Sequence, residues 1–167
     1  MRTKTKTDFL EVLRVLIAHE VKFIVVGGVS AALQGAPIAT LELPLVHSRE
    51  SDNIERLLRA LESLEAIYRA QPERRIKPNA AHLSSPGHRL LLTRFGPLDL
   101  LGMIGGGRGY EKLLAQTVEM KVGDELRIRV LDLETLIQIK EEIAGDKNTA
   151  VLPILRQTLN EKSRHRQ

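Results

Sequence analysis

A short apolar run that ends in two glycines constrains the fold of this chain more than any other feature. Residues 23–26, FIVV, are apolar at every position, and Gly27 and Gly28 follow them directly. A wholly apolar run of this length is typical of a strand that is covered on both faces of a sheet. The alanine-rich residues 29–34 that follow are enough for one brief helix. The pattern therefore predicts a buried strand that turns sharply into a short helix.

The rest of the chain alternates between helical and strand patterns. Apolar residues at helical spacing predict helices at 8–18 (capped by Thr7), 52–64 (capped by Asp52, with Glu55 as its partner), 110–116, 133–144 (capped by Asp132) and a last one with Pro153 in its first turn. Strand patterns bounded by turn residues occur at 41–46, 82–85, 89–95, 98–101, 118–122 and 126–131, with a loop at 71–81. This order predicts an α/β (α+β) fold in which helices flank a mixed sheet.

Length and composition predict a single domain. A chain of 167 residues that is 43% apolar and 28% charged can bury one ordinary core, and no stretch is long enough to act as a linker. We expect one domain over residues 1–167, with flexible basic tails at about 1–6 and 161–167. No apolar run is long enough to cross a bilayer, so we expect a cytoplasmic protein that does not contact a membrane. Cysteine is absent, which excludes disulfide bonds and a thiol nucleophile.

The glycine pair is suited to holding phosphate. Glycine lets the backbone approach an anion closely, and the free N–H groups at a helix start face it. The hydroxyl of Ser30, near the same helix start, can contact phosphate or cap the helix locally. Gly27 and Gly28 lack the spacing of a dinucleotide-binding fold or a P-loop, so a plain tight turn is the alternative.

Three segments together resemble the nucleotidyltransferase superfamily with a polymerase-beta-like palm, and in particular its small AbiEii-like toxin branch. They are FIVVGGVSAALQGAPIATLELPLV at 23–46, GPLDLLG at 96–102, and the ending LIQIK at 136–140 with LPILRQTL at 152–159. The resemblance spans about residues 10 to 160. It implies a nucleotidyltransferase-like mixed sheet flanked by helices.

The resemblance also implies roles for individual residues. In that family the glycine pair lies beneath the nucleotide phosphates, and the next strand carries a threonine followed by two aspartates two residues apart. A third carboxylate lies on a neighbouring strand. By position, Gly27 and Gly28 correspond to the glycine pair, and Thr40 corresponds to the threonine. Glu42 stands at the position of the first aspartate, and Asp99 stands at that of the third carboxylate. Glu42 and Asp99 would then bind Mg²⁺, and Asp99 would also assist deprotonation of the acceptor.

The second aspartate is replaced by Pro44, which has no side-chain oxygen. Residues i and i+2 of a strand point to the same face, which is how two carboxylates converge on magnesium ions. If the missing ligand forfeits about 3 to 4 kcal/mol of charge stabilisation, the rate falls roughly 10²- to 10³-fold. Two further positions depart from the family pattern. Relatives often carry a basic residue where this chain has Ile38, and they often carry Lys-Asp where it has Lys147-Asn148. A proline within a strand also predicts an edge strand or a local distortion at Pro44.

Each of these residues has a simpler interpretation that stays open at this point. Asp99 can cap the turn after Gly-Pro, and Glu42 can be an exposed position opposite core-facing leucines. Lys140 can reach a triphosphate from the 133–144 helix or remain a solvated helix lysine. The glycine loop at 105–109 can close over a ligand with Arg108 on a phosphate, or it can be a disordered connection.

Two functions follow from these alternatives. One is transfer of a nucleotidyl group from a nucleoside triphosphate to an acceptor hydroxyl of a tRNA or protein, weakened or lost because of Pro44. The other is a pseudoenzyme, a non-catalytic nucleotide- or partner-binding protein related to toxin–antitoxin components, with an antitoxin-like partner protein.

Overall fold

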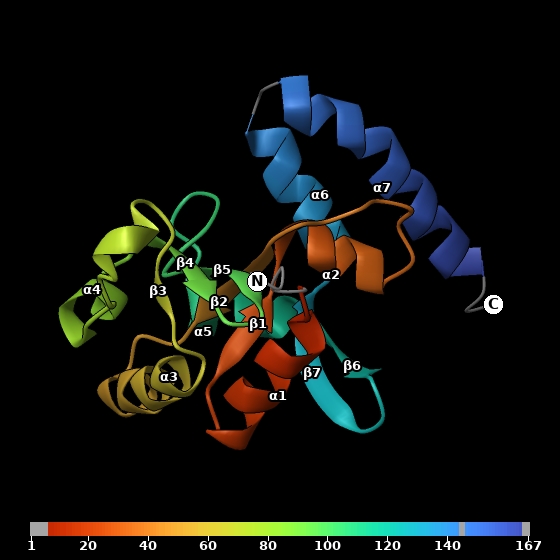
Figure 1. Cartoon of the computed structure of the whole chain (residues 1–167). Helices are drawn as coiled ribbons and strands as arrows, with labels where there is room; N and C mark the ends of the chain where they lie inside the picture. The colour runs from red at the N-terminus through yellow and green to blue at the C-terminus, as the bar shows by residue number, and fades with distance from the viewer. Residues whose placement is uncertain (1–6, 144–145, 165–167) are drawn as a thin grey trace.

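The computed structural model describes residues 7–143 and 146–164, with the backbone alone for 146–149. These residues form a seven-stranded mixed sheet in the order β3-β4-β5-β2-β1-β7-β6 (Figure 1). The strands are β1 (Phe23–Val25), β2 (Leu43–His47), β3 (Ile67–Tyr68), β4 (His88–Thr93), β5 (Gly96–Leu101), β6 (Thr117–Val122) and β7 (Leu126–Leu131). β1 pairs in parallel with β7, and β2 in parallel with β5, whereas the other neighbours are antiparallel. The predicted mixed sheet is confirmed.

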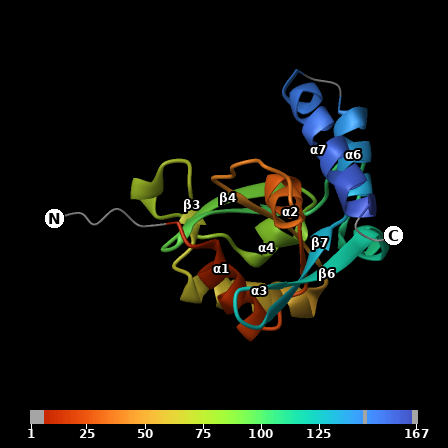
Figure 2. The ribbon, with the colours of Figure 1, turned by 90° about the vertical axis from the view of Figure 1, so that its right-hand side faces the viewer.

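Helices cover both faces of this sheet. They are α1 (Phe9–Ala18), α2 (Gly27–Leu33), α3 (Ser51–Ser63), α4 (Ala80–Ser84), α5 (Tyr110–Leu113), α6 (Leu133–Glu142) and α7 (Asp146–Arg164), with short 3₁₀ turns η1 (Pro72–Arg74) and η2 (Leu114–Gln116). Figure 2 shows α1 and α3 on one side of the sheet and α2 on the other, where α6 and α7 rise together. The domain is therefore a three-layer arrangement of helices, sheet and helices.

The core divides into two apolar clusters, one on each face of the sheet. Alternate residues of β2 and β5 supply them, because successive side chains of a strand point to opposite faces. Leu45 and Leu100 are fully buried on the face that packs against α1 and α3. Val46 and Leu101 are buried on the face that packs against α2 and α6. Burying each leucine contributes roughly 1.5–3 kcal/mol, so both faces of β2 and β5 hold the sheet in place.

Most predicted elements are present, and α4 is the clearest error. Residues 82–85 were expected to form a strand, but Ala80–Ser84 is a helix. The side chain of Asn79 accepts a hydrogen bond from the backbone N–H of His82 at 2.9 Å, which caps the helix start. The helix α1 is likewise capped by Asp8, which accepts from the N–H of Glu11 at 3.2 Å, and not by Thr7.

The C-terminal helix also begins earlier than predicted. α7 starts at Asp146, so Pro153 lies inside the helix and not in its first turn. Residues 161–164 continue this helix, and Lys162 Nζ donates to Gln34 Oε1 of the α2 C-cap at 2.8 Å. Residues 161–164, which the sequence analysis assigned to a tail, are thus part of α7. The remaining tail residues, 1–6 and 165–167, lie outside the described residues.

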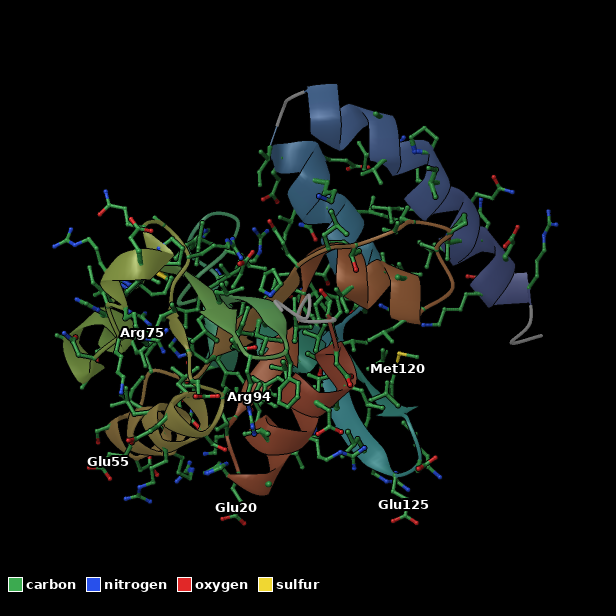
Figure 3. All side chains as sticks on the ribbon, viewed as in Figure 1. Glu20, Glu55, Arg75, Arg94, Met120 and Glu125 are labelled. Atoms are coloured by element: carbon green, nitrogen blue, oxygen red, sulfur yellow. The ribbon has the colours of Figure 1, made fainter. Side chains whose placement is uncertain are left out.

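Charged side chains are concentrated on the outside of this domain. Figure 3 shows the labelled side chains of Glu20, Glu55 and Glu125 pointing away from the sheet at its periphery. Within residues 7–143 and 146–164, none of the helices combines the length and the apolar character that crossing a bilayer requires.

Candidate functional site

Four side chains form a row across one face of the sheet. The parallel pairing of β2 and β5 places Pro44 beside Asp99, and the pairing of β4 and β5 places Leu90 on the other side of Asp99. Just past the end of β3, the backbone N–H of Arg69 donates to the carbonyl of Leu90 at 3.0 Å. Residues opposite one another in a sheet point to the same face. Arg69, Leu90, Asp99 and Pro44 therefore project together, on the face that carries α2 and α6.

Pro44 lies inside the sheet, so the prediction of an edge strand or a distortion is wrong. β2 runs between β5 and β1. The carbonyl of Pro44 accepts a hydrogen bond from the N–H of Val26 at 3.0 Å, so an N–H at Pro44 would face the carbonyl of Val26. β1 has already ended at Val25, and the Val26 carbonyl accepts instead from Ser30 N–H at the start of α2. Proline is tolerated here because the sheet loses no ladder hydrogen bond.

The two carboxylates predicted from the sequence converge on one guanidinium. Asp99 Oδ1 lies 3.0 Å from Arg69 Nη2, and Glu42 Oε1 lies 3.8 Å from the same nitrogen. Asp99 is buried, with 7% of its surface exposed, whereas the Glu42 side chain is 59% exposed. Arg69 was not predicted, because a single arginine after a short strand carries no spacing signature. Its connection to Asp99 becomes visible only when β3, β4 and β5 pair.

Among the described residues, Asp99 Oδ1 is the buried side-chain oxygen that has no hydrogen-bond partner. Its contact with Arg69 is an ion pair by distance, but Oδ1 makes no hydrogen bond and is shielded from solvent. Burial raises the pKa of Asp99, the nearby Glu42 carboxylate raises it further, and Arg69 opposes both. When Asp99 is ionised, the cation beside it is what stabilises its buried charge.

The two glycines are required by packing at the start of α2. Gly27 has a φ of +63°, and a Cβ on it would lie 2.9 Å from Pro44 Cγ. A Cβ on Gly28 would lie 2.8 Å from Thr40 Cγ2. Both distances are too short for any residue other than glycine without a shift of the neighbours. The start of α2 thus packs directly on Pro44 of β2 and on Thr40, which precedes that strand.

Ser30 is directed inward. Its hydroxyl is fully buried and donates to the carbonyl of Gly27 at 2.7 Å, within its own helix. This is the local capping alternative, and it leaves the hydroxyl away from the solvent-facing side of the turn.

An apolar cavity of about 450 Å³ opens beside the glycine turn. Its walls come from the turn between β1 and α2, from β2, β4 and β5, and from the glycine loop and α6. The residues that line it are Val26, Gly27, Pro44, His88, Leu101, Met103, Ile104, Gly105, Gly106, Gly107, Leu136, Ile139, Lys140 and Ile143. The cavity thus joins Gly27 and Lys140, two of the predicted phosphate contacts. Lys140 is half-buried, and burial lowers its pKa. Glu42 and Asp99 do not line this cavity.

The glycine loop is a closed turn that packs on α6. Ile104 and Arg108 exchange backbone hydrogen bonds of 2.9 and 2.8 Å. The Arg108 guanidinium donates to both carboxylate oxygens of Glu142, each at 2.9 Å. The prediction of a disordered connection is therefore wrong. The alternative was that Arg108 contacts a phosphate, but in this structure its guanidinium binds the carboxylate of Glu142.

The residues at the acidic pair do not fit a magnesium site. Within the described residues, no group of three or more His, Asp or Glu side chains is arranged to hold a metal ion. Glu42 and Asp99 are two carboxylates, Pro44 adds no oxygen, and the guanidinium of Arg69 already lies against both. Ile38 is half-buried and supplies no charge, and the side chains of Lys147 and Asn148 lie outside the described residues. The residues present therefore do not fit the two-magnesium site that the resemblance implies.

Solved structures with related folds resemble this chain over most of its length. A proposed nucleotidyltransferase from Thermotoga maritima is 16% identical, with 92% of this chain and 91% of that chain covered at a TM-score of 0.54. The lincosamide antibiotic adenylyltransferase LnuA, solved with lincomycin bound, is 10% identical, with 90% and 95% covered at a TM-score of 0.59. No protein-family model and no curated protein sequence matches the chain. At these identities the likeness establishes the fold.

Proposed function

We propose that this chain, a protein of the nucleotidyltransferase fold, binds a nucleotide beside the glycine turn and transfers nucleotidyl groups weakly or not at all. One observation carries the proposal. Pro44 stands beside Asp99, and a single nitrogen of Arg69 lies between Asp99 and Glu42. The carboxylates that would hold magnesium are thus two in number and are already engaged by a cation of the protein.

The loss of metal ligands sets the expected rate. Metal ions stabilise the charge that develops during phosphoryl transfer, and each ~1.4 kcal/mol of lost stabilisation lowers the rate tenfold. Pro44 removes one ligand, and Arg69 places a positive charge where a divalent cation would have to approach. Both changes act in the same direction, so binding is the activity that the site supports best.

The cavity supplies the binding site in this proposal. Its volume of about 450 Å³ lies within the range of about 300–1,000 Å³ that is usual for small-molecule sites. The apolar walls suit a base and the carbon framework of a ribose, while Lys140 and the backbone at Gly27 are the groups suited to phosphate. Gly27 comes from the start of α2 and Lys140 from α6, and the two elements meet only in the folded domain.

Residual transfer is the second candidate, because Glu42 and Asp99 both lie within 4 Å of the same Arg69 nitrogen, at 3.8 and 3.0 Å. In that case the protein would use Mg²⁺ and move a nucleotidyl group to a tRNA or protein hydroxyl, with Asp99 assisting deprotonation. An antitoxin-like partner protein also stays a prediction from the resemblance.

Calorimetry with each of the four nucleoside triphosphates, with and without Mg²⁺, tests the proposal. We expect binding that does not require Mg²⁺ and that weakens at least about tenfold in Lys140→Met, equivalent to about 1.4 kcal/mol. Lys121→Met, an exposed lysine on β6, is the matched control and should bind as the wild type does. A folded wild-type protein that binds no triphosphate would refute the proposal. Radiolabel transfer to tRNA or protein that Asp99→Ala abolishes would instead favour the enzyme.

A further inference from the structure

The side chain of Arg69 is held in place from two directions. Its backbone N–H bonds to Leu90, and its Nη1 donates to the carbonyl of Leu91 at 3.4 Å. These contacts hold the guanidinium over β4, so that Nη2 reaches Asp99 on the strand beyond. With 27% of its side chain exposed, Arg69 is more enclosed than a typical surface arginine. The position of the guanidinium is therefore a property of the sheet pairing.

One nitrogen serves two carboxylates that would otherwise repel each other. Arg69 Nη2 lies 3.0 Å from Asp99 Oδ1 and 3.8 Å from Glu42 Oε1. Two carboxylates in one site are tolerated when a cation lies between them. A buried carboxylate without such a partner is costly, which applies to Asp99 far more than to the exposed Glu42.

A divalent cation would compete with the guanidinium for the same carboxylate group. Mg²⁺ binds oxygen ligands at about 2.0–2.1 Å and keeps a full octahedral shell of ligands and water. Asp99 Oδ1 already has a guanidinium nitrogen at 3.0 Å and is shielded from solvent. To bind there, the metal would have to displace Arg69 or remain within a few ångströms of another positive charge. Like charges at that separation repel strongly in a partly buried site.

We propose that Arg69 is a built-in cation that takes the place of a divalent metal between Glu42 and Asp99. The site is then held together without a metal, and chelators leave the fold unchanged. The inference deepens the proposed function and rests on the same site, but it concerns the protein without nucleotide. It therefore stands or fails separately from nucleotide binding.

Binding of Mn²⁺ to the nucleotide-free protein, followed by electron paramagnetic resonance, tests the inference. The wild type should bind Mn²⁺ no more tightly than Glu42→Gln/Asp99→Asn, because its carboxylates are already engaged. Arg69→Ala should bind Mn²⁺ at least about tenfold more tightly than the wild type, and adding Asp99→Asn should abolish that gain. The control Arg59→Ala, an exposed arginine on α3, should behave as the wild type does.

Two results would overturn the inference. The first is tighter Mn²⁺ binding by the wild type than by Glu42→Gln/Asp99→Asn, which would show that the carboxylates bind metal while Arg69 is present. This comparison does not depend on the folding of any Arg69 variant. The second is a folded Arg69→Ala protein that gains no Mn²⁺ affinity, with Arg69→Gln as the replacement variant if alanine prevents folding. A failure of the triphosphate titration would refute nucleotide binding and leave this inference standing.

Discussion

Arg69 and Asp99 come from segments two strands apart in the sheet, yet their side chains meet, with Arg69 Nη2 3.0 Å from Asp99 Oδ1. Leu90 lies between them in the row that crosses β4. The contact depends on the pairing of three strands, so it reports directly on whether that edge of the sheet is formed. Because Asp99 is buried and Glu42 is exposed, we also expect mutations that affect these two carboxylates to differ in their cost to stability.

Mutations at the acidic pair should have unequal costs. Arg69→Ala leaves the buried Asp99 without its cation and should lower the free energy of unfolding by roughly 1–3 kcal/mol. Glu42→Gln should change it by less than about 0.5 kcal/mol, because Glu42 is largely exposed and 3.8 Å from Arg69. Urea unfolding of Arg69→Ala, Glu42→Gln and the double variant Arg69→Ala/Asp99→Asn measures these free energies. Equal losses in Arg69→Ala and Glu42→Gln would contradict the geometry.

Restoring the implied ligands should restore metal binding only when the guanidinium is removed. Glu42→Asp with Pro44→Asp supplies two aspartates two residues apart on the face that holds Asp99. With Arg69 present we expect a small gain in Mg²⁺ affinity, and with Arg69→Ala added we expect a gain of at least about tenfold. Calorimetric titration of Mg²⁺ compares the three proteins. If the triple variant binds Mg²⁺ no better than the wild type, the residue correspondence is wrong.

A methyl group at Gly28 should be tolerated only when Thr40 becomes smaller. Gly28→Ala places a Cβ 2.8 Å from Thr40 Cγ2, an overpacking that should cost about 1–3 kcal/mol. Thr40→Ser removes that methyl group and should recover most of the loss in Gly28→Ala/Thr40→Ser. Thermal unfolding of the wild type, the two single variants and the double variant completes a double-mutant cycle, which measures how far the two substitutions interact. Purely additive effects would show that the two residues do not touch.

Acid should destabilise the domain through His47, at the end of β2. Burial is the largest influence on His47 and lowers its pKa below the ordinary value of 6.5, Arg49 acts in the same direction, and the bond to the Ser48 carbonyl opposes them. A base with a lowered pKa binds protons more readily when unfolded, so its contribution is complete above pH 6.5 and is lost as the pH falls toward the folded value. His47→Gln should flatten the decline in Tm between pH 7 and 5, measured by calorimetry. His88→Gln, at an exposed position, is the control; an equal effect there would argue against burial as the cause.

The sequence predicted the elements whose signals are local. The strand before Gly27, the hairpin of β6 and β7, and the Asp132 cap that accepts from Thr135 N–H at 2.7 Å all follow from neighbouring residues. α4 was missed because one capping residue, Asn79, decides it within five helical residues. The family resemblance singled out Glu42 and Asp99, and in the structure both lie against Arg69.

The remaining features depend on pairing across the sheet, which no local pattern encodes. Pro44 suggested an edge strand, but its neighbour Val26 had already turned into α2. Arg69 contacts Asp99 only because β3 pairs with β4 and β4 pairs with β5. Arg108 binds Glu142, which lies 34 residues further along the chain. Each of these contacts depends on the point at which a strand ends or on which helix packs against the loop, and neither is encoded in neighbouring residues.

The bond between Arg108 and Glu142 fixes how the cavity can adapt. Because the glycine loop and α6 are joined at this point, widening the pocket here means either shifting the ten-residue helix α6 or breaking the bond between Arg108 and Glu142. The cost of such a shift rises steeply with displacement, since α6 also packs on α7 and α2. A ligand that binds here should therefore contact the glycine loop and α6 as one joined surface.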